Sequence, residues 1–352
     1  MLVIFVPTFN MEHMTITYAL QIKNYITERI LHAILITIFT LFAIVAVAQA
    51  STTTAFKNDS LLIIRKNPEK GFYNDYILFI PKKTPLHKKT FLLVEPNNTG
   101  KISDSIAIHK KYAIDLASVS SVGNNISTEL SIPLLVPIFP RPASQPLMYT
   151  HALDRDVMLE RSLTLKRLDL QLLQMIEDAQ RILAAMNIET ASQFFMNGFS
   201  ASATFTNRFS FLHPGKIKAL AIGGFNGELM LPQHEINGIP LNYPIGTNDF
   251  NKISGKNFDL DTYRSIPQFI YMGKLDDNDA VQYDDAYNDN ERNIINNNIG
   301  RHVQERYLAC QEIYRQHRIN PIFNRYEGIG HWTTASMNLA VIKFFLAQMQ
   351  EK

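Results

Sequence analysis

The sequence GFSAS, from Gly198 to Ser202, follows the apolar run FFM at 194–196 and precedes a stretch that is typical of a helix. A serine at the apex of a strand–turn–helix, among small neighbours, is typical of a nucleophile elbow. In such a tight turn the serine backbone is strained, and its hydroxyl is lifted out of the sheet toward a substrate. The pattern therefore makes Ser200 a candidate nucleophile.

The last position of this motif departs from the common G-x-S-x-G pattern, because Ser202 stands where a second glycine is usual. Serine is nearly as small as glycine, so the helix can still approach the strand closely. A turn of small residues before a helix is also ordinary packing chemistry, and five residues do not separate the two interpretations. The choice between them depends on the rest of the chain.

Eight apolar runs of strand length follow residue 51, and each is rich in β-branched, aromatic or other apolar residues. They lie at 61–64, 76–80, 90–94, 134–139, 193–197, 217–222, 268–272 and 322–326. Helical patterns lie at 159–186, 201–212, 301–317 and 333–350. Strands that alternate with helices predict an α/β fold, with an eight-stranded, mostly parallel sheet and helices on both faces. The first strands are expected to form a hairpin, which makes the sheet mixed.

A serine nucleophile needs a base to take its proton and an acid to orient that base. The sequence offers Ser200, Asp276 and His331 in that order, each just after an expected strand. Carboxyl ends of parallel strands share one edge of a sheet, so these three side chains are expected to meet there. Asp279 is the alternative acid. A calcium loop is excluded around these aspartates, because the glycine and glutamate that it requires are missing.

Acyl transfer also needs hydrogen-bond donors for the oxyanion of the intermediate. We expect the backbone N–H of Ala201 to be one donor, because it follows the nucleophile at the start of a helix. The second donor is expected from the loop after the third strand, at the N–H of Asn97 or, as the alternative, at Asn98. A plain turn rich in Asn and Gly is the other interpretation of that loop.

Five stretches of the chain, together with the strand pattern, resemble the α/β-hydrolase superfamily and, within it, poorly characterised bacterial serine hydrolases of the esterase and lipase type. They are Leu93–Gly100, Phe139–Pro142, Tyr149–Arg155, Gly198–Ser202 and Gly328–His331, and the resemblance spans roughly residues 60 to 350. It implies the triad roles for Ser200, Asp276 and His331, and it fixes no substrate. Tyr149–Asp156 is expected to border the site, with Asp154 and Arg155 forming an ion pair.

The N-terminal segment has the features of a secretory signal. Residues 30–48 carry no charge, and the A-x-A sequence at 48–50 matches a signal-peptidase site. We therefore expect residues 1–50 to be removed, which leaves 51–352 as a secreted or periplasmic α/β-hydrolase domain. The alternative is a membrane anchor at 30–48, because that run approaches the length needed to span a bilayer. Within the domain, 231–266 is rich in Asn, Gly, Pro and Asp, and it is either a lid over the site or a surface excursion.

Composition and the absence of certain motifs from the sequence exclude several classes of function. The net charge of +2 does not indicate binding to nucleic acid, and the single cysteine, Cys310, allows no internal disulfide. Metal-binding, dinucleotide-binding and phosphate-binding motifs are missing from the sequence, so we expect no metal and no cofactor.

The expected function is hydrolysis of a small carboxylic ester. A peptidase or amidase with the same triad, and a non-catalytic envelope protein with this fold, are the alternatives. The sequence does not indicate an oligomeric state.

Overall fold

The computed structural model describes residues 57–98, 100–119 and 121–350. The expected signal or anchor at 1–50, including 30–48, lies outside these residues and stays a prediction. Within the described part of the chain, no helix combines the length and the apolar composition that a membrane span requires.

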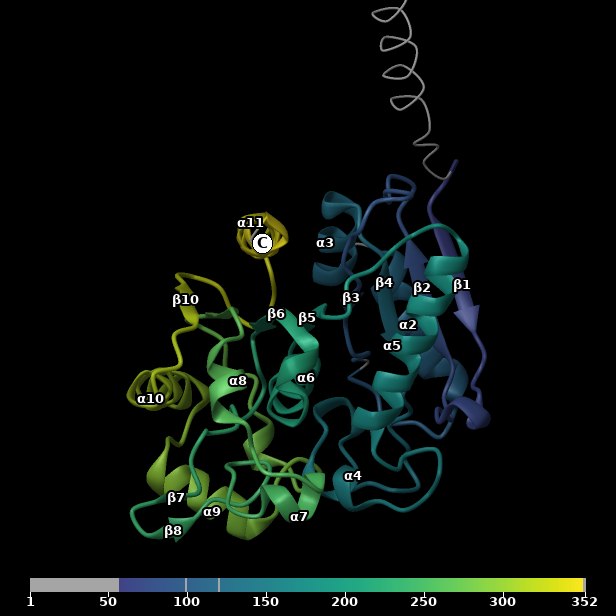
Figure 1. Cartoon of the computed structure of the whole chain (residues 1–352). Helices are drawn as coiled ribbons and strands as arrows, with labels where there is room; N and C mark the ends of the chain where they lie inside the picture. The colour runs from purple at the N-terminus through teal and green to yellow at the C-terminus, as the bar shows by residue number, and fades with distance from the viewer. Residues whose placement is uncertain (1–56, 99, 120, 351–352) are drawn as a thin grey trace, which may run out of the picture. The chain divides into compact units, whose positions relative to one another are not determined.

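The core of the fold is an eight-stranded sheet with the order β1-β2-β4-β3-β5-β6-β9-β10. β1 and β10 form its two edges (Figure 1). Its strands are β1 (Ser60–Ile64), β2 (Tyr76–Ile80), β3 (Leu93–Val94), β4 (Leu134–Pro137), β5 (Phe194–Phe199), β6 (Ile217–Gly223), β9 (Gln268–Gly273) and β10 (Ile322–Tyr326). β2 runs antiparallel to β1 and β4, and all other neighbours are parallel. The eight predicted strands and the N-terminal hairpin are therefore confirmed.

Strands of this sheet are apolar on both faces. In β5, for example, Phe194 and Met196 belong to one buried cluster, whereas Phe195 between them belongs to the other. Side chains alternate between the two faces of a strand, so a strand without polar positions must be covered on both sides. The consecutive apolar residues of the sequence therefore require helices on each face.

Helices cover the sheet in two layers. One layer packs against the cluster that contains Phe195, and it consists of α2 (Ile106–Ser118), α3 (Val122–Leu130) and α11 (Ala335–Gln350). The other packs against Phe194 and Met196, and it consists mainly of α5 (Leu168–Ala185), α6 (Ala201–Leu212) and α10 (Val303–Gln316). Two further helices, α4 (Arg155–Leu159) and α9 (Asp289–Asn298), lie in connecting segments. The predicted α/β architecture with helices on both faces is confirmed.

The segment 231–266 forms a two-stranded sheet and two short helices. These elements are β7 (Glu235–Ile236), β8 (Ile239–Pro240), α7 (Phe250–Ser254) and α8 (Leu260–Arg264). Leu231, Leu241 and Tyr243 of this segment are fully buried in the main core. The segment is therefore packed against the main core, although its sequence shows little hydrophobic periodicity. A lid role for it stays a prediction.

Candidate active site

Ser200 lies in the turn between β5 and α6, with backbone angles φ 63° and ψ −129°. A positive φ is strained for any residue with a Cβ, and such strain concentrates at functional sites. The turn needs a glycine at 198, because a Cβ there would lie 2.2 Å from the backbone oxygen of Ser202. The Ser200 N–H donates to the carbonyl of Gly223, which fixes the turn to the end of β6. The strand–turn–helix context expected for Ser200 is therefore confirmed.

Ser202 replaces the usual second glycine without opening the turn. Its hydroxyl accepts a hydrogen bond from the Phe199 N–H at 2.9 Å and donates one to the Phe199 carbonyl at 2.8 Å. The residue is 1% exposed. The serine therefore stabilises the first turn of α6 with contacts that glycine cannot make.

His331 and Asp276 meet Ser200 at the carboxyl edge of the sheet. The Oγ atom of Ser200 lies 2.9 Å from Nε2 of His331. On the other side of the ring, Nδ1 lies 2.9 and 3.0 Å from the two carboxylate oxygens of Asp276. A carboxylate accepts only, so Nδ1 carries the proton and Nε2 is left as the acceptor that faces the hydroxyl. The structure brings the three predicted side chains into one hydrogen-bonded chain.

Asp279, the alternative acid, is placed elsewhere. Its carboxylate forms an ion pair with the buried guanidinium of Arg306 at 2.5 Å and accepts the N–H of Val281. Arg306 also donates to the carbonyls of Gly227 and Gly300. Asp279 therefore anchors the loop that carries Asp276 and makes no recorded contact with His331.

Asn278 is a polar residue of the site that the sequence interpretation missed. Its side-chain nitrogen Nδ2 lies 2.9 Å from Nε2 of His331 and 3.3 Å from Oγ of Ser200. Its backbone N–H donates to Asp276 Oδ1 at 3.1 Å. The only sequence signal for Asn278 is its position between Asp276 and Asp279, the two candidates for the acid.

The expected oxyanion loop after β3 presents Asn98 to the site in preference to Asn97. The Asn97 side chain is 1% exposed, and it donates to the Phe139 carbonyl at 2.9 Å and accepts the Phe139 N–H at 3.1 Å. Asn98 lines the cavity beside Ser200, and its side chain donates to the Phe199 carbonyl at 3.3 Å. These side-chain contacts do not test which backbone N–H of the loop faces the oxyanion, so the expected Asn97 donor, with Asn98 as the alternative, stays a prediction. Ala201 begins α6, where N–H groups have no partner within the helix.

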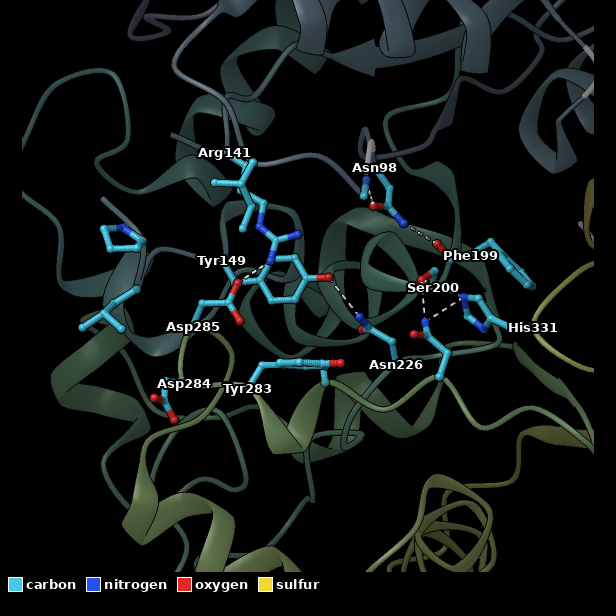
Figure 2. A pocket seen from close by; sticks show the side chains of 16 residues that line it. Asn98, Arg141, Tyr149, Phe199, Ser200, Asn226, Tyr283, Asp284, Asp285 and His331 are labelled. Carbon is cyan, nitrogen blue, oxygen red and sulfur yellow. Dashed lines mark hydrogen bonds and ion pairs between the residues drawn. The ribbon is translucent and has the colours of Figure 1, made fainter. Parts of the chain in front are cut away.

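Ser200 and His331 lie in the wall of a cavity of about 930 Å³, a volume typical of small-molecule sites. Figure 2 shows these two side chains at one side of the cavity and Arg141, Asp284 and Asp285 at the other. The remaining lining residues are mixed in character, and they are Asn98, Gly100, Ile102, Pro146, Leu147, Tyr149, Phe199, Asn226, Asn278, Ala280 and Tyr283. None of them belongs to 231–266.

The side of the cavity away from Ser200 is charged but internally paired. Arg141 forms an ion pair with Asp285, and its guanidinium carbon lies 3.7 Å from the centre of the Tyr149 ring. The Tyr149 hydroxyl accepts a hydrogen bond from Asn226 at 3.0 Å, and burial raises the pKa of Tyr149. This tyrosine is therefore a neutral, fixed wall of the cavity. The expected place of the Tyr149 stretch beside the site is confirmed.

The ion pair expected between Asp154 and Arg155 does not form. Asp154 caps α4 by accepting the N–H groups of Val157 and Tyr149, whereas Arg155 pairs with Asp249 at 2.6 Å. Adjacent residues project in different directions at a helix start, and the carboxylate of an N-cap is bound by backbone donors. Asp154 still holds the Tyr149 loop, but through the backbone.

A buried carboxyl group lies next to the site. Glu95 follows β3, is 3% exposed, and accepts a hydrogen bond from Asn197 of β5 at 2.7 Å. Burial raises the pKa of Glu95 to about 7, although hydrogen bonds from Asn197 and the Gly123 backbone oppose the shift. Glu95 thus links the loop that carries Asn98 to β5, the strand that leads to Ser200.

Among the described residues, no three His, Cys, Asp or Glu side chains are grouped so that they would hold a metal ion. The polar groups of the site are a hydroxyl, an imidazole, a carboxylate and amides. Such a set supports proton transfer and nucleophilic attack.

No protein-family model and no curated protein matches the sequence. The structure is similar to poly(aspartic acid) hydrolase-1 from Sphingomonas sp. KT-1, with a TM-score of 0.53 and 15% identity over 84% of this chain and 100% of that chain. It is also similar to an S-formylglutathione hydrolase from Agrobacterium tumefaciens, with a TM-score of 0.49 and 9% identity over 83% of this chain and 94% of that chain. At 15% identity the similarity to the Sphingomonas enzyme defines the fold and no substrate. Together with the strand order and the elbow at Ser200, this one similarity establishes that the chain has the α/β-hydrolase fold.

Proposed function

We propose that the protein is a serine hydrolase that cleaves a carboxylic ester through an acyl-enzyme intermediate. The observation that carries the proposal is the hydrogen-bonded chain from Ser200 Oγ through His331 to Asp276, with distances of 2.9 Å at each link. It begins at a serine with a strained backbone in the wall of a cavity. A nucleophile, a base and an orienting acid in this geometry are the parts that acyl transfer requires.

In the first half of the reaction, His331 Nε2 takes the proton of Ser200 as Oγ attacks the ester carbonyl. The carbonyl π electrons move to its oxygen, and the carboxylate of Asp276 stabilises the imidazolium that forms. The tetrahedral intermediate collapses, the bond from carbon to the alcohol oxygen breaks, and the Nε2 proton passes to that oxygen. An alcohol leaves, and the acyl group remains on Ser200.

In the second half, a water molecule takes the place of the alcohol. His331 Nε2 removes its proton, the hydroxide oxygen attacks the acyl carbon, and collapse of the new intermediate returns the proton to Ser200 Oγ. The products are a carboxylic acid and the restored enzyme. No cofactor enters these steps, because every proton and electron pair is supplied by the substrate, water and the three side chains.

The negative oxygen of both intermediates needs preorganised donors. We assign this role to the backbone N–H of Ala201, at the N-terminus of α6, and to a donor from Asn98 on the loop after β3. Partial positive charge at a helix N-terminus adds to the stabilisation. Asn98 lines the cavity, whereas the Asn97 side chain is turned to Phe139.

Kinetics on a matched pair of substrates test this function. We expect hydrolysis of p-nitrophenyl butyrate, much slower hydrolysis of the corresponding p-nitroanilide, and loss of ester turnover by about 10⁴-fold or more in Ser200→Ala. Faster hydrolysis of the anilide would favour a peptidase or amidase with the same triad. A folded protein without turnover of either compound would favour a non-catalytic protein of this fold.

A further inference from the structure

The side-chain amide of Asn278 faces the two reacting groups of the site. Its Nδ2 atom lies 2.9 Å from His331 Nε2 and 3.3 Å from Ser200 Oγ, while those two atoms lie 2.9 Å from each other. The three polar atoms therefore form a closed triangle at the cavity wall. The proposed acyl-transfer cycle above uses only two of them.

The loop that carries Asn278 is held on both sides. The Asn278 N–H donates to Asp276, and the following residue, Asp279, pairs with the fully buried Arg306. Gln304 donates to the carbonyls of Gly273 and Asp276 at 2.8 Å each. A side chain on so constrained a backbone is preorganised, which is the property that a catalytic donor needs.

The resting geometry presents two donors to one acceptor. With its proton on Nδ1, His331 has a single lone pair on Nε2, and both the Ser200 hydroxyl and the Asn278 amide point to it. When Nε2 takes the serine proton it becomes a donor, and the amide loses its acceptor there. Of the two acceptors of the amide, only Ser200 Oγ at 3.3 Å then remains, so one N–H of Asn278 is released at the moment when the tetrahedral intermediate forms.

The position of the loop separates Asn278 from the expected oxyanion donors. In the sheet, β3 lies on one side of β5, whereas β6, β9 and β10 lie on the other. Asn98 follows β3, and Asn278 follows β9. The amide of Asn278 therefore approaches Ser200 from the side of His331, where the departing oxygen must lie to receive its proton.

We propose that Asn278 is a catalytic residue that donates a hydrogen bond to the leaving-group oxygen. This inference rests on the ester hydrolysis proposed above and adds a role specific to the breaking bond. The leaving oxygen is bonded to the same carbon as Ser200 Oγ and must come within reach of the Nε2 proton. An amide next to both atoms stabilises the charge that develops on that oxygen as its bond to carbon breaks. His331 then supplies the proton, and the alcohol departs.

Kinetics on two esters of butyric acid distinguish this catalytic role of Asn278 from a structural one. Ethyl butyrate has a poor leaving group that needs stabilisation, whereas p-nitrophenolate departs with little help. The ratio kcat/KM includes only the steps through acylation, so the deacylation that both esters share does not enter it. In Asn278→Ala and Asn278→Leu, we expect kcat/KM for ethyl butyrate to fall about 10²-fold, and that for p-nitrophenyl butyrate to fall less than about 5-fold.

Labelling of Ser200 by a fluorophosphonate, retained in both variants, is the measure that they are folded with an intact triad. Asn297→Ala, an exposed asparagine on α9, is the matched control and should leave both esters unaffected. An equal loss on the two esters overturns the proposal, because a displaced loop impairs both alike. A gain on both also overturns it, since Asn278 would then only compete with Ser200 for Nε2. Failure of the parent function is distinct, because the wild-type protein would then neither label nor hydrolyse either ester.

Discussion

The carboxylate of Asp276 lies 2.9 Å from Nδ1 of His331, although 55 residues separate the two along the chain. Asp276 follows β9 and His331 follows β10, and these neighbouring parallel strands are in register from Phe269 to Gly273. The contact between Asp276 and His331 therefore follows from the order of the strands in the sheet. It also distinguishes Asp276 from Asp279, which pairs with Arg306.

Substitution of the two aspartates should affect different properties. We expect Asp276→Asn to lower kcat by about 10⁴-fold, because an amide no longer orients the imidazole or stabilises its charge. Asp279→Asn should instead lower the free energy of unfolding by about 3 kcal/mol, because it removes the closer of the two carboxylates beside the buried Arg306 guanidinium and leaves only Glu228, at 3.8 Å. Ester kinetics and urea unfolding of both variants measure the two effects. Greater loss of activity in a folded Asp279→Asn protein would reverse the assignment of the acid.

Gly198→Ala tests the elbow by adding one methyl group. The new Cβ would lie 2.2 Å from the backbone oxygen of Ser202 and 2.6 Å from the N atom of Ala203, so the turn and α6 must separate. We expect a stability loss of about 1–3 kcal/mol, as for other overpacked sites, together with loss of esterase activity. Gly215→Ala, at an exposed glycine without a positive φ where the nearest heavy atom would lie 4.0 Å from the new Cβ, is a control for the change in residue type. Normal activity of Gly198→Ala would mean that Ser200 tolerates a different turn.

Ser202→Ala tests whether the second small residue of the motif contributes more than its size. Alanine preserves the close approach of α6 but removes the hydroxyl that bonds both backbone groups of Phe199. We expect a loss of about 1 kcal/mol in the free energy of unfolding, with Ser200 still reactive. Thermal and urea unfolding give the stability, and ester turnover gives the reactivity. An unchanged stability would indicate that water replaces the hydroxyl.

Glu95→Gln should make the protein less sensitive to alkaline pH. Burial raises the pKa of Glu95 from 4.5 in an unfolded chain to about 7 in the fold. Between these values the native protein binds more protons than the unfolded chain, so stability is lost as the pH rises. Glutamine has no proton to lose. The stability of the variant relative to wild type should therefore increase by about 3 kcal/mol between about pH 5 and about pH 8.5.

Denaturant unfolding at both pH values measures this difference. Glutamine keeps a side-chain oxygen that accepts the Asn197 amide, as Glu95 does at 2.7 Å. Glu327→Gln is a control, because that carboxylate is exposed and paired with Lys274. A stability difference between Glu95→Gln and wild type that stays constant with pH would contradict the buried, protonated state of Glu95.

Most strands could be predicted from the sequence because they are continuous apolar runs, such as 61–64 and 76–80, and such a run is visible without knowledge of the neighbouring strands. In β10 the run is interrupted by Asn324 and Arg325. Among the longer helices, α2, α3 and α9 lie outside the predicted helical ranges. In α2, Ile106 and Ile108 are exposed and the buried face is built of Ala113 and Ala117, so the hydrophobic periodicity is weak. Ser121, which caps α3, was a usable signal, since its hydroxyl accepts the N–H of Asn124 at 3.0 Å.

The three residues proposed as the triad could be inferred because their order along the chain follows the order of the strands. The polar residues around the proposed triad could not be inferred in this way. Asn278 and Asn98 each have an equally plausible sequence neighbour, and only the direction of the loop backbone decides that the Asn278 side chain reaches Ser200 and that Asn98 lines the cavity beside it. Loop direction depends on distant contacts, such as those of Arg306 and Phe139, that no local pattern encodes.

Covalent labelling tests the central claim most directly. The account predicts that a fluorophosphonate reacts with the wild-type protein at one position, that mass spectrometry of the digest finds the adduct on Ser200, and that Ser200→Ala and His331→Ala do not label. An adduct on another residue, or labelling that persists in folded Ser200→Ala protein, would contradict it.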